Sequence, residues 1–277
     1  MTPREASERK QGGPRAQGAA RLAVRSSHAA SRIHRLYQQG CAKMRFPARS
    51  GTMQEAVLIN TAGGVTGGDQ LDWRIEVGEH ASCTALTQAC EKAYRSEGEA
   101  ARIGVSLVIA AGARLDWLPQ ETILFEDSKL ERRFEADLSG DARLLAVEAV
   151  ILGRRARGET AHGARLTDQW RVRRNGRLIF ADALRLDRAL QDDGPALLEG
   201  AGAYALVLLA DADAESLAER ARSTLEQTTS GARAGVSAFD SKLVCRILAP
   251  DGAALRRMLL PLMALLRDAP APRLWMV

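Results

Sequence analysis

Strict alternation of apolar and charged residues is the feature that most limits how this chain can fold. In residues 71–77 (LDWRIEV) every odd position is apolar and every even position is charged. A similar period of two runs through residues 103–109 and 130–138. This period places the apolar side chains on one face of a β-strand, whereas an amphipathic helix needs a period of about 3.6. The three segments therefore predict half-buried strands.

Short strand patterns recur along most of the chain, whereas only two segments are typical of helices. Further strands are predicted at 143–151, 165–174, 177–184, 203–209 and 241–248, separated by turn residues. The predicted helices are Ala214–Gln227 and Ala253–Arg267, the second kinked or interrupted at Pro261. We expect their apolar stripes to pack in the core. The predicted fold class is mainly β, with layered or stacked antiparallel sheets and two α-helices in the C-terminal part.

A glycine-rich stretch, Asn60–Asp69 (NTAGGVTGGD), lies between two predicted strands. Four glycines within six positions allow backbone angles that a Cβ atom would forbid. A phosphate-binding glycine loop gains its affinity for anions from a helix that starts just after it, but here the next segment is a strand. The stretch therefore predicts a sharp connection between two strands rather than a nucleotide site.

Composition is ordinary for a water-soluble protein: 46% of the 277 residues are hydrophobic and 26% are charged. No apolar run approaches the roughly 20 residues that span a bilayer, so we expect a cytoplasmic protein without a membrane contact. The four cysteines are scattered without a Cys-x-x-Cys pair, which favours reduced thiols.

Positive charge is concentrated near the N-terminus, where residues 1–49 hold 11 Lys and Arg against two acidic residues. No aromatic residue precedes Tyr37, so the charges indicate a solvated tail rather than a nucleic-acid site. Residues 1–20 are polar and lack periodicity, which predicts a disordered basic tail. Residues 21–277 are expected to form a single β-rich domain.

Catalytic patterns are missing from the sequence. It has no Gly-x-Ser-x-Gly, and none of its four histidines lies in a recognisable motif. The carboxylates are more suggestive, since Asp69 closes the glycine-rich stretch and Glu121 lies among apolar residues. A buried carboxylate needs a partner, water or a cation. A structural ion pair and a metal path explain these residues equally well.

Several of these segments, in order along the chain, resemble the signature blocks of the UreD (UreH) family of urease accessory proteins. The resemblance covers residues from about 20 to the end. The segments are Asn60–Asp69, Thr87-Gln88 with Lys92–Ser96, Trp117–Phe125, Gly153-Arg154 with Arg157–Glu159, Asp182–Leu186 and Pro272–Trp275. Position 62 is Ala where the family usually has Pro.

This resemblance implies a maturation factor and chaperone, not an enzyme. UreD-like proteins bind apo-urease and the accessory protein UreF, which recruits the GTPase UreG. A dimer of the assembled complex is one expectation that follows. The assembly inserts nickel while the GTPase hydrolyses GTP, so transient Ni²⁺ rather than a tightly bound cofactor is expected. The family is thought to carry nickel through a water-filled tunnel.

The tunnel suggests a role for three acids. Sparse carboxylates would attract Ni²⁺ without caging it, and we expect Asp69, Glu121 and Glu159 to contribute to such a path. The alternative is a stand-alone nickel-binding protein or enzyme, which would need a tight site with His or Cys ligands. A scaffold with an exposed apolar stripe should self-associate unless UreF is present.

Overall fold

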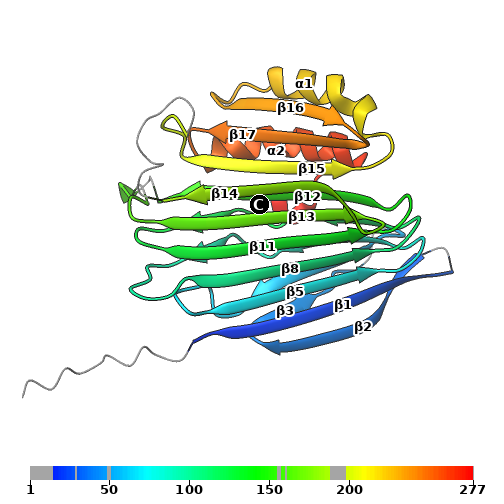
Figure 1. The fold of residues 1–277 in the computed structure, drawn as a ribbon, viewed down its shortest axis with the longest axis horizontal. Coiled ribbons are helices and arrows are strands. Elements are labelled where there is room, and N and C mark those ends of the chain that lie inside the picture. The colour runs from blue at the N-terminus through cyan, green and yellow to red at the C-terminus, as the bar shows by residue number, and fades with distance from the viewer. Residues whose placement is uncertain are drawn as a thin grey trace, which may run out of the picture.

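Two stacked β-sheets and a layer of helices make up the protein, as Figure 1 shows. The structure, a computed structural model, describes residues 15–28, 30–48, 51–154, 157–159, 161–187 and 198–276. The first sheet has the strand order β14 (Arg177–Leu186), β13 (Arg165–Arg174), β11 (Lys129–Leu138), β8 (Ala101–Ile109), β5 (Gln70–Val77), β1 (Gln17–Ser27) and β2 (Ala30–Gly40).

The second sheet has the order β16 (Arg233–Phe239), β17 (Lys242–Ala249), β15 (Ala203–Ala210), β12 (Arg143–Leu152), β9 (Arg114–Trp117), β6 (Ser82–Thr87), β4 (Gln54–Asn60) and β3 (Ala42–Arg45). Two short strands extend it, β10 (Thr122–Leu124) beside β12 and β7 (Glu91–Ala93) beside β10. The helices are α1 (Ala218–Glu226), preceded by the 3₁₀ turn η3 (Ala214–Leu217), α2 (Gly252–Arg267) and the 3₁₀ turn η4 (Arg273–Trp275).

From β4 to β13 the chain winds alternately between the two sheets. Strands β5, β8, β11 and β13 add to the first sheet, and β4, β6, β9 and β12 add to the second. At one end of the sandwich the connections are four-residue turns at 78–81, 110–113 and 139–142, each closed by a hydrogen bond between its last N–H and its first carbonyl. At the other end the connections are longer. Within this winding region, the longer loops that could form a binding surface therefore lie at that second end.

This winding overturns the expectation of antiparallel sheets. Within each sheet the strands of the winding region pair in parallel, for example β5 with β8 and β6 with β9. Successive strands lie in different sheets, so neighbours within one sheet come from successive turns of the chain and run in the same direction. Antiparallel pairing remains at the margins, between β1 and β2, β3 and β4, β13 and β14, and among β12, β15, β17 and β16.

Two hydrophobic cores separate the three layers. The larger core lies between the sheets and includes Phe134 and Trp170, whose rings stack at 4.3 Å between centroids. The smaller core lies between the second sheet and the helices, and holds Leu255, Met258 and Trp275. Strand β12 contributes to both cores, which explains its almost continuous apolar sequence. The expected packing of the helix stripes in the core is confirmed.

The predicted elements are largely confirmed, with three differences. β1 begins at Gln17, within the predicted tail, and residues 1–14 lie outside the described part of the chain. α2 continues through Pro261 without interruption, because its buried residues on both sides of the proline pack in the smaller core. The strands β7, β10 and β16 were not expected. Neither described helix combines the length and hydropathy needed to cross a bilayer.

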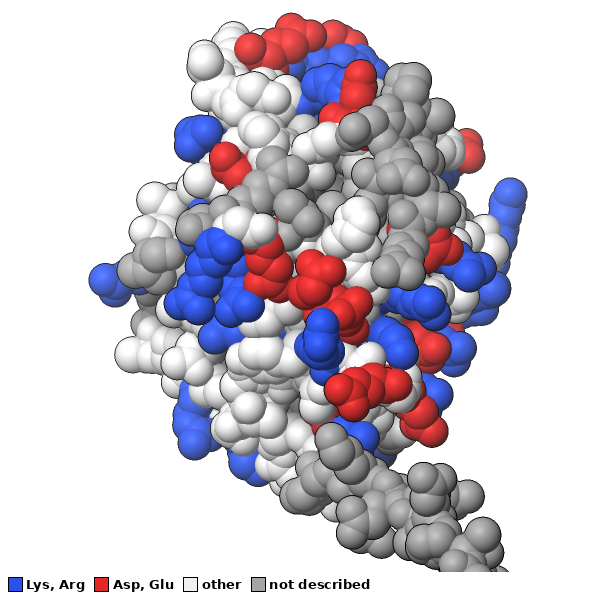
Figure 2. Space-filling view, turned by 90° about the vertical axis from the view of Figure 1, so that its left-hand side faces the viewer, with Lys and Arg blue, Asp and Glu red and all other residues white. Residues whose placement is uncertain are grey.

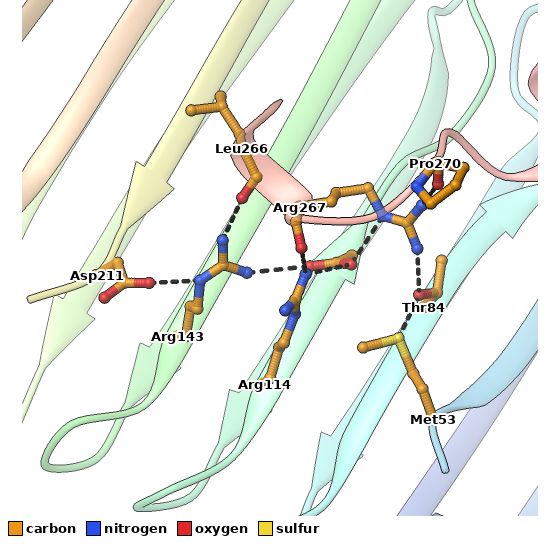
Figure 3. A network of polar contacts seen from close by, with 9 residues as sticks. Met53, Thr84, Arg114, Arg143, Asp211, Leu266, Arg267 and Pro270 are labelled. Carbon is orange, nitrogen blue, oxygen red and sulfur yellow. Dashed lines mark hydrogen bonds and ion pairs between the residues drawn. The ribbon is translucent and has the colours of Figure 1, made fainter. Parts of the chain in front are cut away.

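A network of charged residues fastens the C-terminal end of α2 to the second sheet (Figure 3). Asp116, fully buried on β9, pairs with Arg114, Arg143 and Arg267 at 3.3, 3.5 and 3.0 Å. Arg114 and Arg143 also donate hydrogen bonds to the carbonyls of Arg267 and Leu266. These last carbonyls of a helix have no partner within it and carry partial negative charge, which the two guanidinium groups neutralise.

Candidate functional site

Four parallel strands of the second sheet, β4, β6, β9 and β12, finish at the same end of the sandwich. The described segments that follow them are residues 60–69, 88–96, 118–127 and 153–154 with 157–159, and we call the surface they form the motif end. Figure 2 looks onto this end, where Asp and Glu side chains gather near the middle of the face with Lys and Arg on either side. Parallel pairing alone thus brings four distant stretches together.

Backbone pairing joins these segments to one another. Val65 forms a parallel bridge with Ala93, β7 pairs with β10, and β10 pairs with the last residues of β12. The N–H of Gly153 donates to the carbonyl of Leu124 at 2.8 Å. The motif end is therefore a hydrogen-bonded surface rather than a set of independent loops.

The glycine-rich stretch joins β4 to β5, as the sequence predicts. Asp69, only 4% exposed, accepts hydrogen bonds from the N–H groups of Ala16 and Thr66, both at 2.8 Å. Gly64 has a φ of +150°, and a Cβ atom there would lie 2.3 Å from the Tyr94 ring. Asp69 thus ties the loop to the start of β1, and Gly64 lets the Tyr94 ring lie against its backbone.

An aromatic and ionic stack covers the centre of the motif end. The rings of Tyr94 and Phe125 meet edge to face at 5.1 Å, and the Arg154 guanidinium lies 4.3 Å from the Phe125 centroid. Arg154 pairs with Glu159 at 2.5 Å, and Glu159 also accepts the N–H of Glu126 at 2.6 Å. Burial acts to raise the pKa of Glu159, but these hydrogen bonds and the Arg154 charge hold it below its usual value.

Glu121 lies beneath this surface, 1% exposed. Both of its oxygens accept hydrogen bonds from Arg256 on α2, at 3.1 and 2.7 Å, and the Cys90 thiol donates to it at 3.4 Å. Hydrogen bonding to Glu121 raises the pKa of Arg256. Burial and the neighbouring carboxylate raise the pKa of Cys90 to about 11, so the thiol keeps its proton at neutral pH. A carboxylate and a thiol therefore lie together under one arginine.

A second group of buried charges continues inward from the motif end, between the two sheets. Arg132 on β11 donates to Glu148 on β12 and to Asp168 on β13, the latter at 2.5 Å, and reaches Thr122 at 3.3 Å. Trp117 donates its indole N–H to Glu148 at 2.9 Å. Burial and the Asp168 charge raise the pKa of Glu148, which Arg132 opposes. One cation thus serves two carboxylates inside the larger core.

Several buried polar atoms, two of them in this group, have no hydrogen-bond partner among the described residues. They include Arg132 Nε, Asp168 Oδ1, Trp170 Nε1 and Ser128 Oγ. Buried polar atoms of this kind are commonly satisfied by internal water.

The sequence pattern of the family described as UreD urease accessory protein matches residues 16–276. The chain belongs to the UreD family. The urease accessory protein UreD of Chelativorans sp. is 45% identical over 265 residues, which is 95% of both chains. Those of Rhizobium etli and Agrobacterium fabrum are 46% and 40% identical over 264 residues, 94% of this chain and 95% and 91% of theirs. Membership of the UreD family implies a role in urease maturation.

The three acids singled out in this UreD sequence all lie at the motif end, but each has its own partners. Asp69 accepts backbone N–H groups, Glu121 pairs with Arg256, and Glu159 pairs with Arg154. No contact between any two of them is found among the described residues. In the same part of the chain, no three His, Cys, Asp or Glu side chains lie together as a metal-binding group.

Sequence reasoning did not propose Arg132, Glu148 and Asp168 as site residues. Each is a charged residue in an apolar register: Arg132 shares a face with Leu130 and Phe134, for example. The alternating pattern itself carried this signal, because a charge on the core face must be paired or hydrated. What the pattern could not show is that three strands bring these charges into contact.

Proposed function

We propose that this chain is a scaffold for nickel insertion into urease. It binds apo-urease and the UreF–UreG accessory complex as a dimeric assembly in the cytoplasm, and GTP is hydrolysed by the partner GTPase rather than by this chain. The observation that carries the proposal is the meeting of four of the UreD signature segments at one end of the sandwich, in a chain related to UreD proteins over nearly its full length. A surface built from several chain segments suits partner binding.

The proposed nickel path enters at the motif end, with Asp69, Glu121 and Glu159 as its acids, and continues past Glu148 and Asp168 between the sheets. The acids are spaced apart rather than clustered, which favours passage over storage because Ni²⁺ meets few ligands at a time. Arg132 Nε and Asp168 Oδ1 have no hydrogen-bond partner among the described residues, which supports water in this space. At Glu121, Arg256 already neutralises the carboxylate, so the cation would have to displace its guanidinium group.

Co-purification tests the scaffold role. The tagged chain is expressed with UreF, UreG and apo-urease, and the recovered complex is assayed for partner content, nickel per urease and urease activity. We expect the partners to be recovered with the chain and activation to fail without it. Urease that is activated equally well in its absence would refute the proposal.

Glu121→Gln and Glu148→Gln then test the path. We expect both variants to recover the partners but to load less nickel than the unchanged chain, and circular dichroism checks that they are folded. Glu79→Gln is the control, because Glu79 is exposed in a turn at the opposite end. Full nickel loading by both variants would mean that Glu121 and Glu148 do not belong to the nickel path. The proposed scaffold role would be unaffected.

The alternative, a stand-alone nickel-binding protein or enzyme, makes a different prediction. Equilibrium dialysis of the isolated chain with Ni²⁺ would then show stoichiometric binding at micromolar metal. The Cys90 and Glu121 pair is the feature that comes nearest to such a site, but it offers two ligands and the thiol is protonated.

A further inference from the structure

Strand β2 forms an open edge of the first sheet. It is 11 residues long and pairs with β1, but with no other strand of the described chain. Figure 1 shows it as the outermost strand on the side away from the helices. Ser31, near its start, is hydrogen-bonded to Thr52. From Arg32 to Gln39, alternate backbone N–H and C=O groups therefore face outward, as on any edge strand.

The core-facing side of β2 carries apolar residues that the sandwich covers only in part. In the register with β1, Ile33 lies opposite Val24 and Leu36 opposite Leu22. Val24 and Leu22 are buried, whereas Ile33 and Leu36 are each 39% exposed. A further strand added outside β2 would cover both side chains and continue the core by one strand.

The outer side of β2 carries positive charge. Arg32 lies opposite Arg25, and Tyr37 lies opposite Arg21, whose guanidinium is 5.6 Å from the Tyr37 ring. Arg35 extends the row, and like Arg32 it is exposed and forms no ion pair among the described residues. No Asp or Glu occurs between Glu8 and Glu55 in the sequence, so the strand has no acidic neighbour in its own stretch of chain.

These charges also limit what can pair with β2. A second copy of this chain would bring the arginines of two β2 strands side by side, and like charges opposite each other destabilise a strand pair. A nucleic acid would meet the charges but would leave the backbone groups and the exposed Ile33 and Leu36 unmatched. An acidic strand would match the positive charges, the outward backbone groups and the exposed Ile33 and Leu36.

We propose that β2 receives an extended, acidic segment of a partner protein as an additional strand of the first sheet. The segment alternates apolar residues, which cover Ile33 and Leu36, with Asp or Glu, which face Arg32 and Arg35. Backbone hydrogen bonds supply affinity, and the alternation supplies specificity. This inference does not depend on nickel delivery or on the motif end, because β2 lies on a different surface.

A designed peptide tests the inference with the full-length chain. The probe is a capped, fluorescent octapeptide that alternates Val and Glu, and binding is followed by fluorescence anisotropy at low salt. One comparison peptide alternates Val and Lys, and another is the Val–Glu peptide with N-methyl groups on alternate amides, which removes backbone donors. We expect saturable binding of the Val–Glu peptide, and weakening of at least about tenfold for each comparison peptide.

The matched variants are Arg32→Glu/Arg35→Glu on β2 and Arg171→Glu/Arg177→Glu on β13 and β14. All four residues are exposed in the same sheet, and both pairs change the net charge equally. We expect the β2 variant to lose about tenfold or more in affinity and the control to lose less than about twofold.

Three results would overturn the inference. They are no binding of the Val–Glu peptide, equal binding of the N-methylated peptide, and equal losses in the two variants. Equal competition by a single-stranded oligonucleotide would likewise show a general anion surface rather than a strand-pairing edge. The peptide assay measures binding to β2 directly. Its result therefore does not depend on whether the chain activates urease or loads nickel.

Discussion

Arg132 is the residue on which the interior of this protein most depends, because it neutralises two buried carboxylates. Arg132→Met would leave Glu148 and Asp168 facing each other in the larger core. We expect the free energy of unfolding at pH 7 to fall by about 3–5 kcal/mol, measured by urea denaturation. The deficit should shrink as the pH falls, because burial and the Asp168 charge already raise the pKa of Glu148 and the loss of Arg132 raises it further.

The control for this change is Arg133→Met on the same strand, where Arg133 is exposed. A surface substitution there should alter stability by less than about 0.5 kcal/mol. Similar losses for the two variants would mean that the buried pairing contributes little.

Gly63 and Gly64 test how closely the loop backbone approaches its neighbours. Both have positive φ, but a Cβ atom on Gly63 meets nothing within 4 Å, whereas one on Gly64 would lie 2.7 Å from the Lys92 carbonyl oxygen. Gly63→Ala should cost about 1 kcal/mol from backbone strain alone. Gly64→Ala should cost clearly more and displace Tyr94, measurable by thermal unfolding and tyrosine fluorescence. Equal costs would contradict the close packing of this loop.

Glu91 should make stability depend on pH. Burial raises its pKa in the folded protein, which hydrogen bonds from Asn60 and Lys92 only partly offset. The folded state therefore binds its proton more tightly than the unfolded state, and stability falls as pH rises from the unfolded pKa to the folded one. Glu91→Gln removes the cost of burying an ionised carboxylate. The variant should therefore gain stability relative to the parent as the pH rises through that window, and keep the gain at pH 7. If the free energy of unfolding changed with pH in the same way for both proteins, a raised pKa of Glu91 would be refuted.

At the scale of elements, α2 is held at both ends. Asp251 accepts the Ala254 N–H at 2.7 Å at the start of the helix, and the arginines around Asp116 bind its last carbonyls. This anchoring, together with the buried apolar face, explains how the helix tolerates an internal proline.

Asp116→Asn tests the anchor. Three arginines would then lie together without their shared buried carboxylate, and we expect a loss of about 3 kcal/mol in the free energy of unfolding. Asp213→Asn, at an exposed aspartate that makes no side-chain cap, should change it by less than about 0.5 kcal/mol. An unchanged far-ultraviolet circular dichroism spectrum together with a lower midpoint of unfolding would show that the anchor was weakened and the helix itself was kept.

Whether a strand was predictable depended on its surroundings. Strands with one buried face, such as β11 and β13, follow the alternating pattern and were predicted within a residue or two. β16 was missed because it lies at a sheet margin and has no fully buried residue. Only Val236 and Ala238 are half-buried, an alternation too short to stand out. β7 and β10 have three residues each, too few to show a period.

At the scale of the whole molecule, the two ends of the sandwich differ. We expect Lys92→Glu, an exposed change at the motif end, to reduce both recovery of the partners and activation of urease. Glu79→Lys, an exposed charge reversal at the opposite end, should leave both unchanged. Co-purification and urease activity assays measure the effect of both variants. A larger effect of Glu79→Lys than of Lys92→Glu would mean that the partners bind at the end opposite the motif end.

The sequence by itself determined that the chain is β-rich, where most strands lie, that a glycine-rich stretch connects two of them, and which family it resembles. These features are local: a period of two, a cluster of glycines and short signature segments can each be recognised without knowing what they touch. Tertiary structure alone decided that the inner strands run in parallel, that four of the signature segments meet at one end, and that Arg132, Glu148 and Asp168 share one buried cluster. Those facts depend on pairing between residues far apart in the chain, and alternation within a strand says which face is buried but not which strand lies beside it.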